Sequence, residues 1–169
     1  MKQSLETPEV MCGKIRAAVD KRLNKDFAII TRTEALIQGH GQSVALERAK
    51  MYNDAGCDAF LIHSKSKTPD EVLEFADAYH KANLRAPLVC VPTTYNNVTI
   101  EELNSAGFSL VIYANYSVRA AVKAIETVFK KMYEAGSLSA ANDDVVGMEK
   151  IFELIRVDQL KENQEKYGS

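Results

Sequence analysis

The sequence predicts a parallel α/β fold, and three observations support this prediction. Short apolar runs recur at residues 27–30, 59–63, 87–91 and 110–114. Each run is continuously apolar rather than alternating, which is typical of parallel strands covered on both faces. Amphipathic segments lie between the runs, as expected when strands and helices alternate along a chain.

Start and stop signals support the helices between these strands. Residues 68–82 begin with Thr68 as the expected N-cap and with Glu71 closing a capping box. Residues 99–107 repeat this arrangement with Thr99 at the N-cap. The predicted helices span residues 10–23, 43–56, 68–82, 99–107 and 117–135.

The longest predicted helix carries an apolar stripe that we expect to be buried against the strands. The stripe consists of Val118, Ala121, Val122, Ile125, Val128, Phe129 and Met132. A polar linker begins after Gly136 and leads to a last amphipathic segment from Met148. We therefore expect one domain over residues 1–136, and a linker with a helical extension over residues 137–169.

Composition and charge exclude several classes of protein. Hydrophobic residues make up 46% of the 169 residues and charged residues 26%, as in ordinary globular domains. A formal net charge of −2 gives no reason to expect binding to nucleic acid or to an anionic membrane. No apolar run reaches the length of a membrane span, and the first ten residues do not resemble a signal peptide. We expect a cytoplasmic protein.

The three cysteines, Cys12, Cys57 and Cys90, are far apart in the sequence. Their number and spacing favour neither a disulfide framework nor a zinc site. Apolar neighbours surround Cys57 and Cys90, so we expect buried and unreactive thiols. Cys12 lies in a predicted helix and is interpreted as structural.

Polar residues follow the predicted strands, where the carboxyl ends of parallel strands meet and ligands commonly bind. Arg32 and Glu34 follow the first strand, and His63 ends the second. A guanidinium group suits a carboxylate or phosphoryl group, although an ion pair with Glu34 would also explain Arg32. An imidazole at His63 can stabilise a developing oxyanion, although a core histidine is the common alternative.

Other polar residues near the strand ends are weaker candidates. Ser64 follows His63, and Thr93 lies past the third strand, where hydroxyl groups can line a pocket. Lys65 is equally well explained as a solvated loop residue. His40 and His80 lie in a loop and on a helix, and we expect both at the surface.

Four stretches in order carry a resemblance to a known family. They read "IITRTEALIQGHG", "ERAKMYNDAGCDAFLIHSK", "PLVCVPTTY" and "VIYANYSVRAAVKAI". Together they resemble the phosphoenolpyruvate mutase and isocitrate lyase superfamily, most closely the mutases and next the phosphonopyruvate hydrolases. The resemblance implies a (β/α)8 barrel, which needs about 250 residues. The four strands of this chain would form its second, C-terminal half.

The resemblance also implies an activity and a set of site residues. The activity is the magnesium-dependent interconversion of phosphoenolpyruvate and phosphonopyruvate. Arg32 and His63 would be catalytic, and the substrate would be bound by Arg32, His63, Glu34, Ser64 and Thr93. The magnesium ligands would belong to the missing N-terminal half, so none is expected in this chain.

Several alternatives stay open at this point. A hydrolase acting on phosphonopyruvate, or a carbon–carbon lyase of the 2-methylisocitrate or isocitrate type, would share most of these residues. A non-catalytic half-barrel, present as a fragment or an assembly subunit, is a hypothesis of another class. Four strands leave open sheet edges, so we expect a homo-oligomer or a complementary half-barrel as partner. The resemblance implies that the last helix can be exchanged between subunits.

Overall fold

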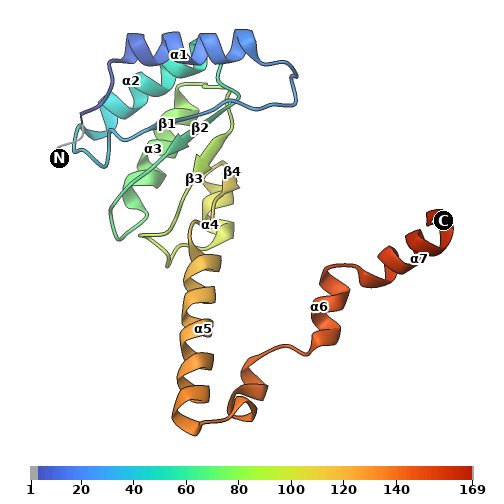
Figure 1. Cartoon of the computed structure of the whole chain (residues 1–169). Helices are drawn as coiled ribbons and strands as arrows, with labels where there is room; N and C mark the ends of the chain where they lie inside the picture. The colour runs from blue at the N-terminus through green and yellow to red at the C-terminus, as the bar shows by residue number, and fades with distance from the viewer. Residues whose placement is uncertain (1–3, 169) are drawn as a thin grey trace. The chain divides into compact units, whose positions relative to one another are not determined.

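The computed structural model describes residues 4–168, and strands and helices alternate along its first part (Figure 1). In chain order the elements are α1 (Pro8–Lys21), β1 (Ile30–Thr33), α2 (Gly41–Asp54), β2 (Ala59–Ile62), α3 (Asp70–Lys81), β3 (Leu88–Cys90), α4 (Ile100–Ser105), β4 (Phe108–Val111), α5 (Tyr116–Ala135), the 3-10 helix η1 (Leu138–Asp144), α6 (Met148–Leu154) and α7 (Val157–Tyr167). The predicted alternation of strands and helices is confirmed.

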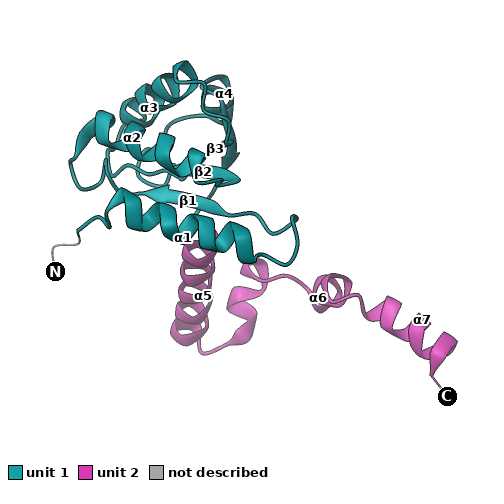
Figure 2. Ribbon diagram, turned by 90° about the horizontal axis from the view of Figure 1, so that it is seen from above, with its two compact units in different colours: residues 1–114 teal, residues 115–169 magenta. Residues whose placement is uncertain are grey.

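The chain forms two compact units, residues 1–114 and residues 115–169 (Figure 2). The first unit holds the four strands and helices α1 to α4, and the second holds α5, η1, α6 and α7. The domain boundary expected after residue 136 stays a prediction. Every residue singled out as a candidate for the site lies in the first unit.

The four strands form one parallel sheet in the order β1-β2-β3-β4. Helices α2, α3 and α4 each connect one strand to its neighbour, which is the usual connection between parallel strands. The carboxyl ends of all four strands therefore meet at one edge of the sheet. In the part of the chain that the structure describes, β1 and β4 each pair with one strand, so the sheet has two free edges.

The two faces of this sheet are covered unequally. One face packs on the main core, where its strand residues are at most 4% exposed. These residues are Phe60, Ile62, Leu88, Cys90 and Phe108. The other face carries a small apolar cluster formed by Leu61, Val89 and Val91. Arg32 pairs with Leu61 in the strand register, so it belongs to this second face.

The first strand begins later than the sequence predicted, and this is a correction. It starts at Ile30 rather than at residue 27, and Phe27 is 65% exposed. The backbone before β1 is held by side chains and by one backbone hydrogen bond of 2.9 Å, which the amide of Asp58 donates to the carbonyl of Ile29. Asp58 accepts a hydrogen bond of 2.7 Å from the amide of Ile29, and Arg22 donates one of 3.3 Å to the carbonyl of Phe27.

The outer strands are also less buried than continuous apolar runs suggested. In β1 exposed and buried residues alternate, and in β4 Leu110 is 46% exposed. β4 begins at Phe108 rather than at residue 110. Full burial on both faces is confined to the inner strands, since β1 and β4 lack a second neighbour among the described residues.

The two predicted capping boxes had opposite outcomes. At α4 the box is confirmed, since the amide of Glu102 donates to the Thr99 hydroxyl and the Glu102 carboxylate accepts from the Thr99 amide. At α3 the prediction is wrong, because the N-cap residue is Pro69 and no side chain caps the helix. Glu71 instead accepts a hydrogen bond from Ser64. A tertiary partner has replaced the local one.

The apolar stripe of α5 is not buried, contrary to the sequence prediction. Helix α5 has no buried residue, and the exposed fractions of Val118, Val122, Ile125 and Phe129 lie between 50% and 64%. Periodicity predicted correctly which face is apolar, but burial also requires an element that covers it. Within the second unit η1 is the element that packs beside α5.

The segment after α5 is more regular than a linker. Residues 138–144, predicted as part of a polar linker, form η1. The last amphipathic segment divides into α6 and α7 at Arg156, whose φ of 55° interrupts the helix. Among residues 4–168, no helix is both long enough and apolar enough to cross a membrane.

Candidate functional site

Arg32 and His63 contact each other at the carboxyl end of the sheet. Arg32 is on β1, and His63 follows β2 two positions beyond Leu61. Because alternate residues of a strand share a face, both belong to the face with the small apolar cluster. Nη2 of Arg32 lies 2.9 Å from Nδ1 of His63. The structure thus brings together the two residues for which the sequence predicted a catalytic role.

The direction of this hydrogen bond follows from the chemistry of the guanidinium group. An arginine side chain has only donors and keeps its proton throughout the physiological range. Nδ1 of His63 therefore accepts, and the neutral ring carries its proton on Nε2. The pair presents a positive charge beside a ring N–H donor, which is a suitable arrangement for binding an anion.

Glu34 forms an ion pair with Arg32 from the turn after β1. Its carboxylate accepts from Nε of Arg32, and the side chains of Arg32 and Glu34 are 46% and 30% exposed. The ion pair with Glu34, which was the alternative explanation for Arg32, is therefore present together with the contact to His63. The contacts formed within residues 4–168 use Nε and Nη2, which leaves Nη1 for another acceptor.

The environment of His63 favours its neutral form. Burial lowers the pKa of His63 below its usual value, and the positive charge of Arg32 lowers this pKa further. The negative charge of Glu34 acts in the opposite direction and is the smallest of the three effects. At neutral pH the imidazole is thus uncharged, in agreement with its role as acceptor at Nδ1.

Ser64 lies next to His63, but its hydroxyl group faces the interior. Ser64 is completely buried, and its Oγ donates a hydrogen bond to the carboxylate of Glu71. The same Oγ accepts a hydrogen bond of 2.9 Å from the amide of Ser66. The hydroxyl joins the loop after β2 to the start of α3. A substrate-binding role for Ser64 stays a prediction, and Lys65 is exposed.

Thr93 lies on the loop after β3 and has an unusual hydroxyl group. Its Oγ1 is buried and has no hydrogen-bond partner in the described part of the chain. A buried hydroxyl without a partner costs free energy that a bound group could recover. Beside it, Thr94 donates a hydrogen bond of 3.1 Å to the carbonyl of Ser64 and so joins the loops after β2 and β3. The substrate-binding role of Thr93 stays a prediction.

A hollow of about 530 Å³ adjoins Arg32 and Glu34. Its walls come from the segment before α1, from α1 itself, from β1 with the turn that follows, and from α2. The lining residues are Ser4, Leu5, Glu6, Met11, Arg32, Thr33, Glu34, Gln38, Arg48 and Tyr52. His63 lies outside this lining, so the hollow adjoins the Arg32–His63 pair rather than enclosing it. Its volume is typical of sites for small molecules.

Arg48 is a residue of this hollow that the sequence analysis did not single out. It lies on α2 and is 8% exposed. Positions three and four apart share a helix face, so Arg48 lies on the same face as Ala45 and Tyr52. A basic residue within an otherwise apolar stripe is the signal that could have revealed it.

The remaining predicted residues behave as expected. Cys12, Cys57 and Cys90 are buried free thiols. Burial raises the pKa of Cys57 above its usual value and raises that of Cys90 to about 12, which makes both poor nucleophiles. His40 and His80 are exposed.

The described residues do not provide a magnesium site. Within residues 4–168, no group of three or more histidine, cysteine, aspartate or glutamate residues could hold a metal ion. Magnesium takes carboxylate oxygens as its protein ligands, and Glu34 near the site is engaged by Arg32. No chemical step is therefore assigned to a metal bound by these residues.

Comparison with known proteins agrees with this arrangement of strands. The profile of the family described as phosphoenolpyruvate phosphomutase matches residues 1–133. The chain belongs to this family. It is 38% identical to the phosphonopyruvate hydrolase of Variovorax sp. (strain Pal2) over 98% of the chain and 57% of that protein. It is 36% identical to the phosphoenolpyruvate phosphomutase of Tetrahymena pyriformis over 98% of the chain and 54% of that protein.

Solved structures of family members have the same fold. The phosphoenolpyruvate phosphomutase from Streptomyces platensis subsp. rosaceus matches with a TM-score of 0.93 at 38% identity, over 99% of this chain and 57% of that one. A phosphonopyruvate hydrolase in complex with oxalate and Mg²⁺ also matches with a TM-score of 0.93, over 100% of this chain and 59% of that one. The chain thus spans somewhat more than half the length of these relatives, in agreement with the predicted partial barrel.

Proposed function

We propose that this chain forms part of an enzyme acting on phosphoenolpyruvate or phosphonopyruvate, in which Arg32 and His63 bind the anionic substrate. The observation that carries the proposal is their direct contact at the carboxyl end of the sheet. Nη1 of Arg32 and Nε2 of His63 are donors suited to the oxygens of a carboxylate or phosphonate. In this proposal the predicted contributions of Glu34, Ser64 and Thr93 are secondary, since the first two are engaged with protein groups.

The proposed reaction is the interconversion of phosphoenolpyruvate and phosphonopyruvate. It moves a phosphoryl group between oxygen and carbon, so negative charge on the substrate must be held and oriented throughout. Arg32 would supply charge stabilisation and His63 a neutral donor, both through positioning rather than covalent chemistry. Magnesium belongs to the proposal because a related hydrolase binds it with oxalate, and its ligands would lie outside residues 4–168.

Hydrolysis of phosphonopyruvate is a second candidate that a specific observation favours. The hydrolase of Variovorax is 38% identical to this chain and the mutase of Tetrahymena 36%, so identity does not separate the two activities. Carbon–carbon lyase chemistry has weaker support, since the 2-methylisocitrate lyase of Aeropyrum pernix is 32% identical and the 2,3-dimethylmalate lyase of Eubacterium barkeri 29%.

The proposal also includes a partner that completes the barrel. The two free edges of the sheet carry backbone groups that a further strand can pair with. The exposed stripe of α5 is an apolar surface that a further polypeptide can cover. The partner would be a second copy of this chain or a complementary half-barrel. A cytoplasmic location stays a prediction.

Phosphorus NMR of the purified chain with phosphonopyruvate and magnesium chloride tests the proposal. We expect a phosphoenolpyruvate signal to grow if the chain acts as a mutase. Growth of inorganic phosphate would instead establish the hydrolase. An unchanged spectrum would contradict an activity of this chain alone and would favour the non-catalytic alternative.

A pair of arginine variants makes this experiment specific to the site. Arg32→Lys keeps the positive charge but loses the planar fork, so we expect turnover to fall about tenfold or more. The matched variant Arg85→Lys changes an exposed arginine and is expected to leave turnover unchanged. Equal turnover in both variants would contradict the role proposed for Arg32.

A further inference from the structure

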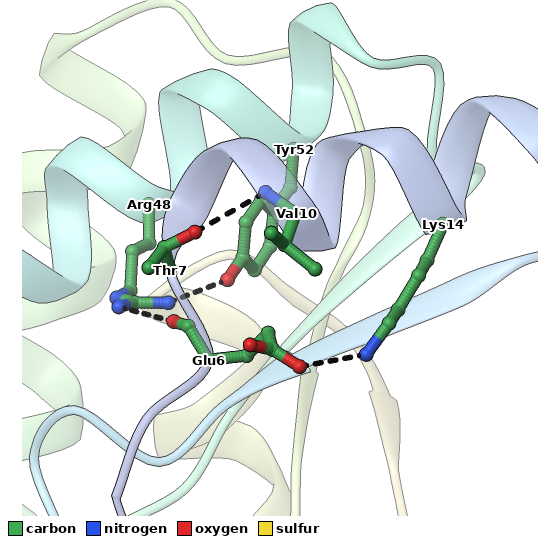
Figure 3. Close-up of polar contacts among 6 residues, drawn as sticks. All are labelled: Glu6, Thr7, Val10, Lys14, Arg48 and Tyr52. Atoms are coloured by element: carbon green, nitrogen blue, oxygen red, sulfur yellow. Dashed lines mark hydrogen bonds and ion pairs between the residues drawn. The ribbon is translucent and has the colours of Figure 1, made fainter.

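Arg48 is a buried cation that neutral groups hold in place (Figure 3). Its Nη1 donates a hydrogen bond of 2.9 Å to the hydroxyl of Tyr52, and its Nη2 donates one of 2.8 Å to the carbonyl oxygen of Glu6. Counting residues 4–168, no carboxylate forms an ion pair with Arg48, and its Nε has no hydrogen-bond partner.

Stability alone does not account for an arginine at this position. Removing a charged group from water is costly, and an arginine cannot avoid the cost by losing its proton. Two hydrogen bonds to neutral acceptors recover part of that cost, whereas an apolar side chain of similar length would avoid it altogether. We therefore look for the role of Arg48 in the groups that its two hydrogen bonds hold in place.

The hydrogen bond to Glu6 fixes the backbone just before α1. The next residue, Thr7, is the N-cap of α1, and its hydroxyl accepts from the amide of Val10. Ser4, Leu5 and Glu6 form a wall of the hollow that Arg32 and Glu34 also line. The buried side chain of Arg48 on α2 thus holds one wall of the hollow that Arg32 and Glu34 also line.

A second interaction of Glu6 provides an internal comparison. The carboxylate of Glu6 pairs with Lys14, as Figure 3 shows. The distance is 2.8 Å, and the side chains of Glu6 and Lys14 are 51% and 61% exposed. Exposed ion pairs of this kind contribute little to stability because water and salt screen them. We therefore expect the buried hydrogen bond to the Glu6 carbonyl to stabilise this segment more than the exposed ion pair of the Glu6 carboxylate does.

We propose that Arg48 is a positioning residue that, with Tyr52, fixes residues 4–6 as one wall of the hollow beside Arg32. Arg48 acts through the backbone of Glu6. This inference rests on the proposed function to the extent that the hollow receives part of the anionic substrate.

Amide hydrogen exchange of two variants tests the first part of this proposal. Arg48→Met removes both hydrogen bonds while keeping a long apolar side chain, and Lys14→Met removes a cation that contacts only the Glu6 carboxylate. In Arg48→Met we expect the amides of Val10 and Met11 to exchange about tenfold faster, because a hydrogen bond to a charged group is lost. In Lys14→Met, and at the sheet amide of Leu61, exchange should stay unchanged.

If Arg48→Met does not fold, Tyr52→Phe provides a second variant for the same exchange measurement. It removes one acceptor and retains Arg48, so we expect a smaller acceleration at Val10 and Met11 in the same direction. Unchanged exchange at these amides in the folded variants would overturn the proposal. Equal acceleration in Lys14→Met would also overturn it, since the exposed ion pair would then matter as much.

Titration with oxalate in the presence of magnesium tests the link to the site. We expect the dissociation constant for oxalate to rise about tenfold in Arg48→Met and to stay unchanged in Lys14→Met. Faster exchange without any loss of oxalate affinity would overturn the link between the wall and the site. An unmodified chain that binds no oxalate would count against the proposed function, and the exchange data would still decide the role of Arg48.

Discussion

The charge state of His63 depends on two neighbours of opposite sign. The positive charge of Arg32 lowers the pKa of His63, and the negative charge of Glu34 raises it. We therefore expect Arg32→Met to raise this pKa and Glu34→Gln to lower it. NMR titration of the His63 imidazole signals measures both shifts. Shifts of the same sign in both variants would contradict this electrostatic explanation.

The lowered pKa of His63 also predicts how stability depends on pH. Between the pKa of folded His63 and the ordinary value near 6.5, the unfolded chain binds more protons than the folded chain. This difference makes the free energy of unfolding rise with pH across that window. Urea unfolding at a series of pH values, compared with His63→Gln, isolates the effect. The variant should lose this part of the pH dependence, and an identical dependence in both proteins would refute the prediction.

Burial predicts that the three thiols of the native chain are unreactive. With the pKa of Cys90 raised to about 12, about one thiol in ten thousand would be ionised at pH 8. Reaction with a dithiobisnitrobenzoate reagent should therefore be at least about a hundredfold slower in the native chain than in urea, where all three thiols are exposed. Fast reaction of one thiol without denaturant would show that its surroundings open readily.

Residue types at strand ends could be predicted from the sequence, whereas their partners could not. The apolar runs before Arg32 and His63 indicated that both lie at one edge of a sheet, and the structure places them in contact. The burial of Ser64 against Glu71 depends on how α3 packs beside the loop after β2. The position of the Arg48 side chain likewise depends on a residue far away in the sequence, because it donates a hydrogen bond to the carbonyl of Glu6. Contacts between residues far apart in sequence leave no local pattern.

Among the helices, the two candidate capping residues provide a matched pair for a stability measurement. Thr99 caps α4 with its hydroxyl, whereas Thr68 lies outside α3 and contacts Ser66 at 3.3 Å. Thr99→Ala should lower the free energy of unfolding by about 1 kcal/mol, the usual effect of losing an N-cap. Thr68→Ala should change it by less than about 0.5 kcal/mol. Urea unfolding measures both values, and an equal loss would contradict the assignment of the caps.

Element types were easier to predict than element ends. The alternation of strands and helices follows from hydrophobic periodicity, which depends only on neighbouring residues. The start of β1 depends on Asp58, whose carboxylate accepts from the amide of Ile29 and whose own amide donates to the carbonyl of Ile29. The start of α3 depends on Glu71, which binds Ser64 instead of capping the helix. In both cases the element end depends on a residue or partner that the local pattern does not reveal.

At the scale of the whole molecule, burial is the property that the sequence could not predict. The stripe of α5 has the period of a buried helix face, yet Val122 and Phe129 are 50% and 62% exposed. Leu110 and Tyr113 are also exposed, at 46% and 57%, on and just after the last strand. Apolar surface of this kind marks places where another polypeptide binds or where chains aggregate. The partner proposed above to complete the barrel would cover this surface.

The exposed stripe predicts that the isolated chain associates with itself. Phe129→Asp places a charge in the middle of the stripe and should weaken association about tenfold or more, since burying an unpaired carboxylate is costly. Thr127→Asp is the matched control, because it adds the same charge on the opposite side of α5, between Lys123 and Lys131. Light scattering over a range of concentrations measures both variants. A monodisperse, stable monomer for the unmodified chain would show that this surface needs no partner and would contradict the proposed completion of the barrel.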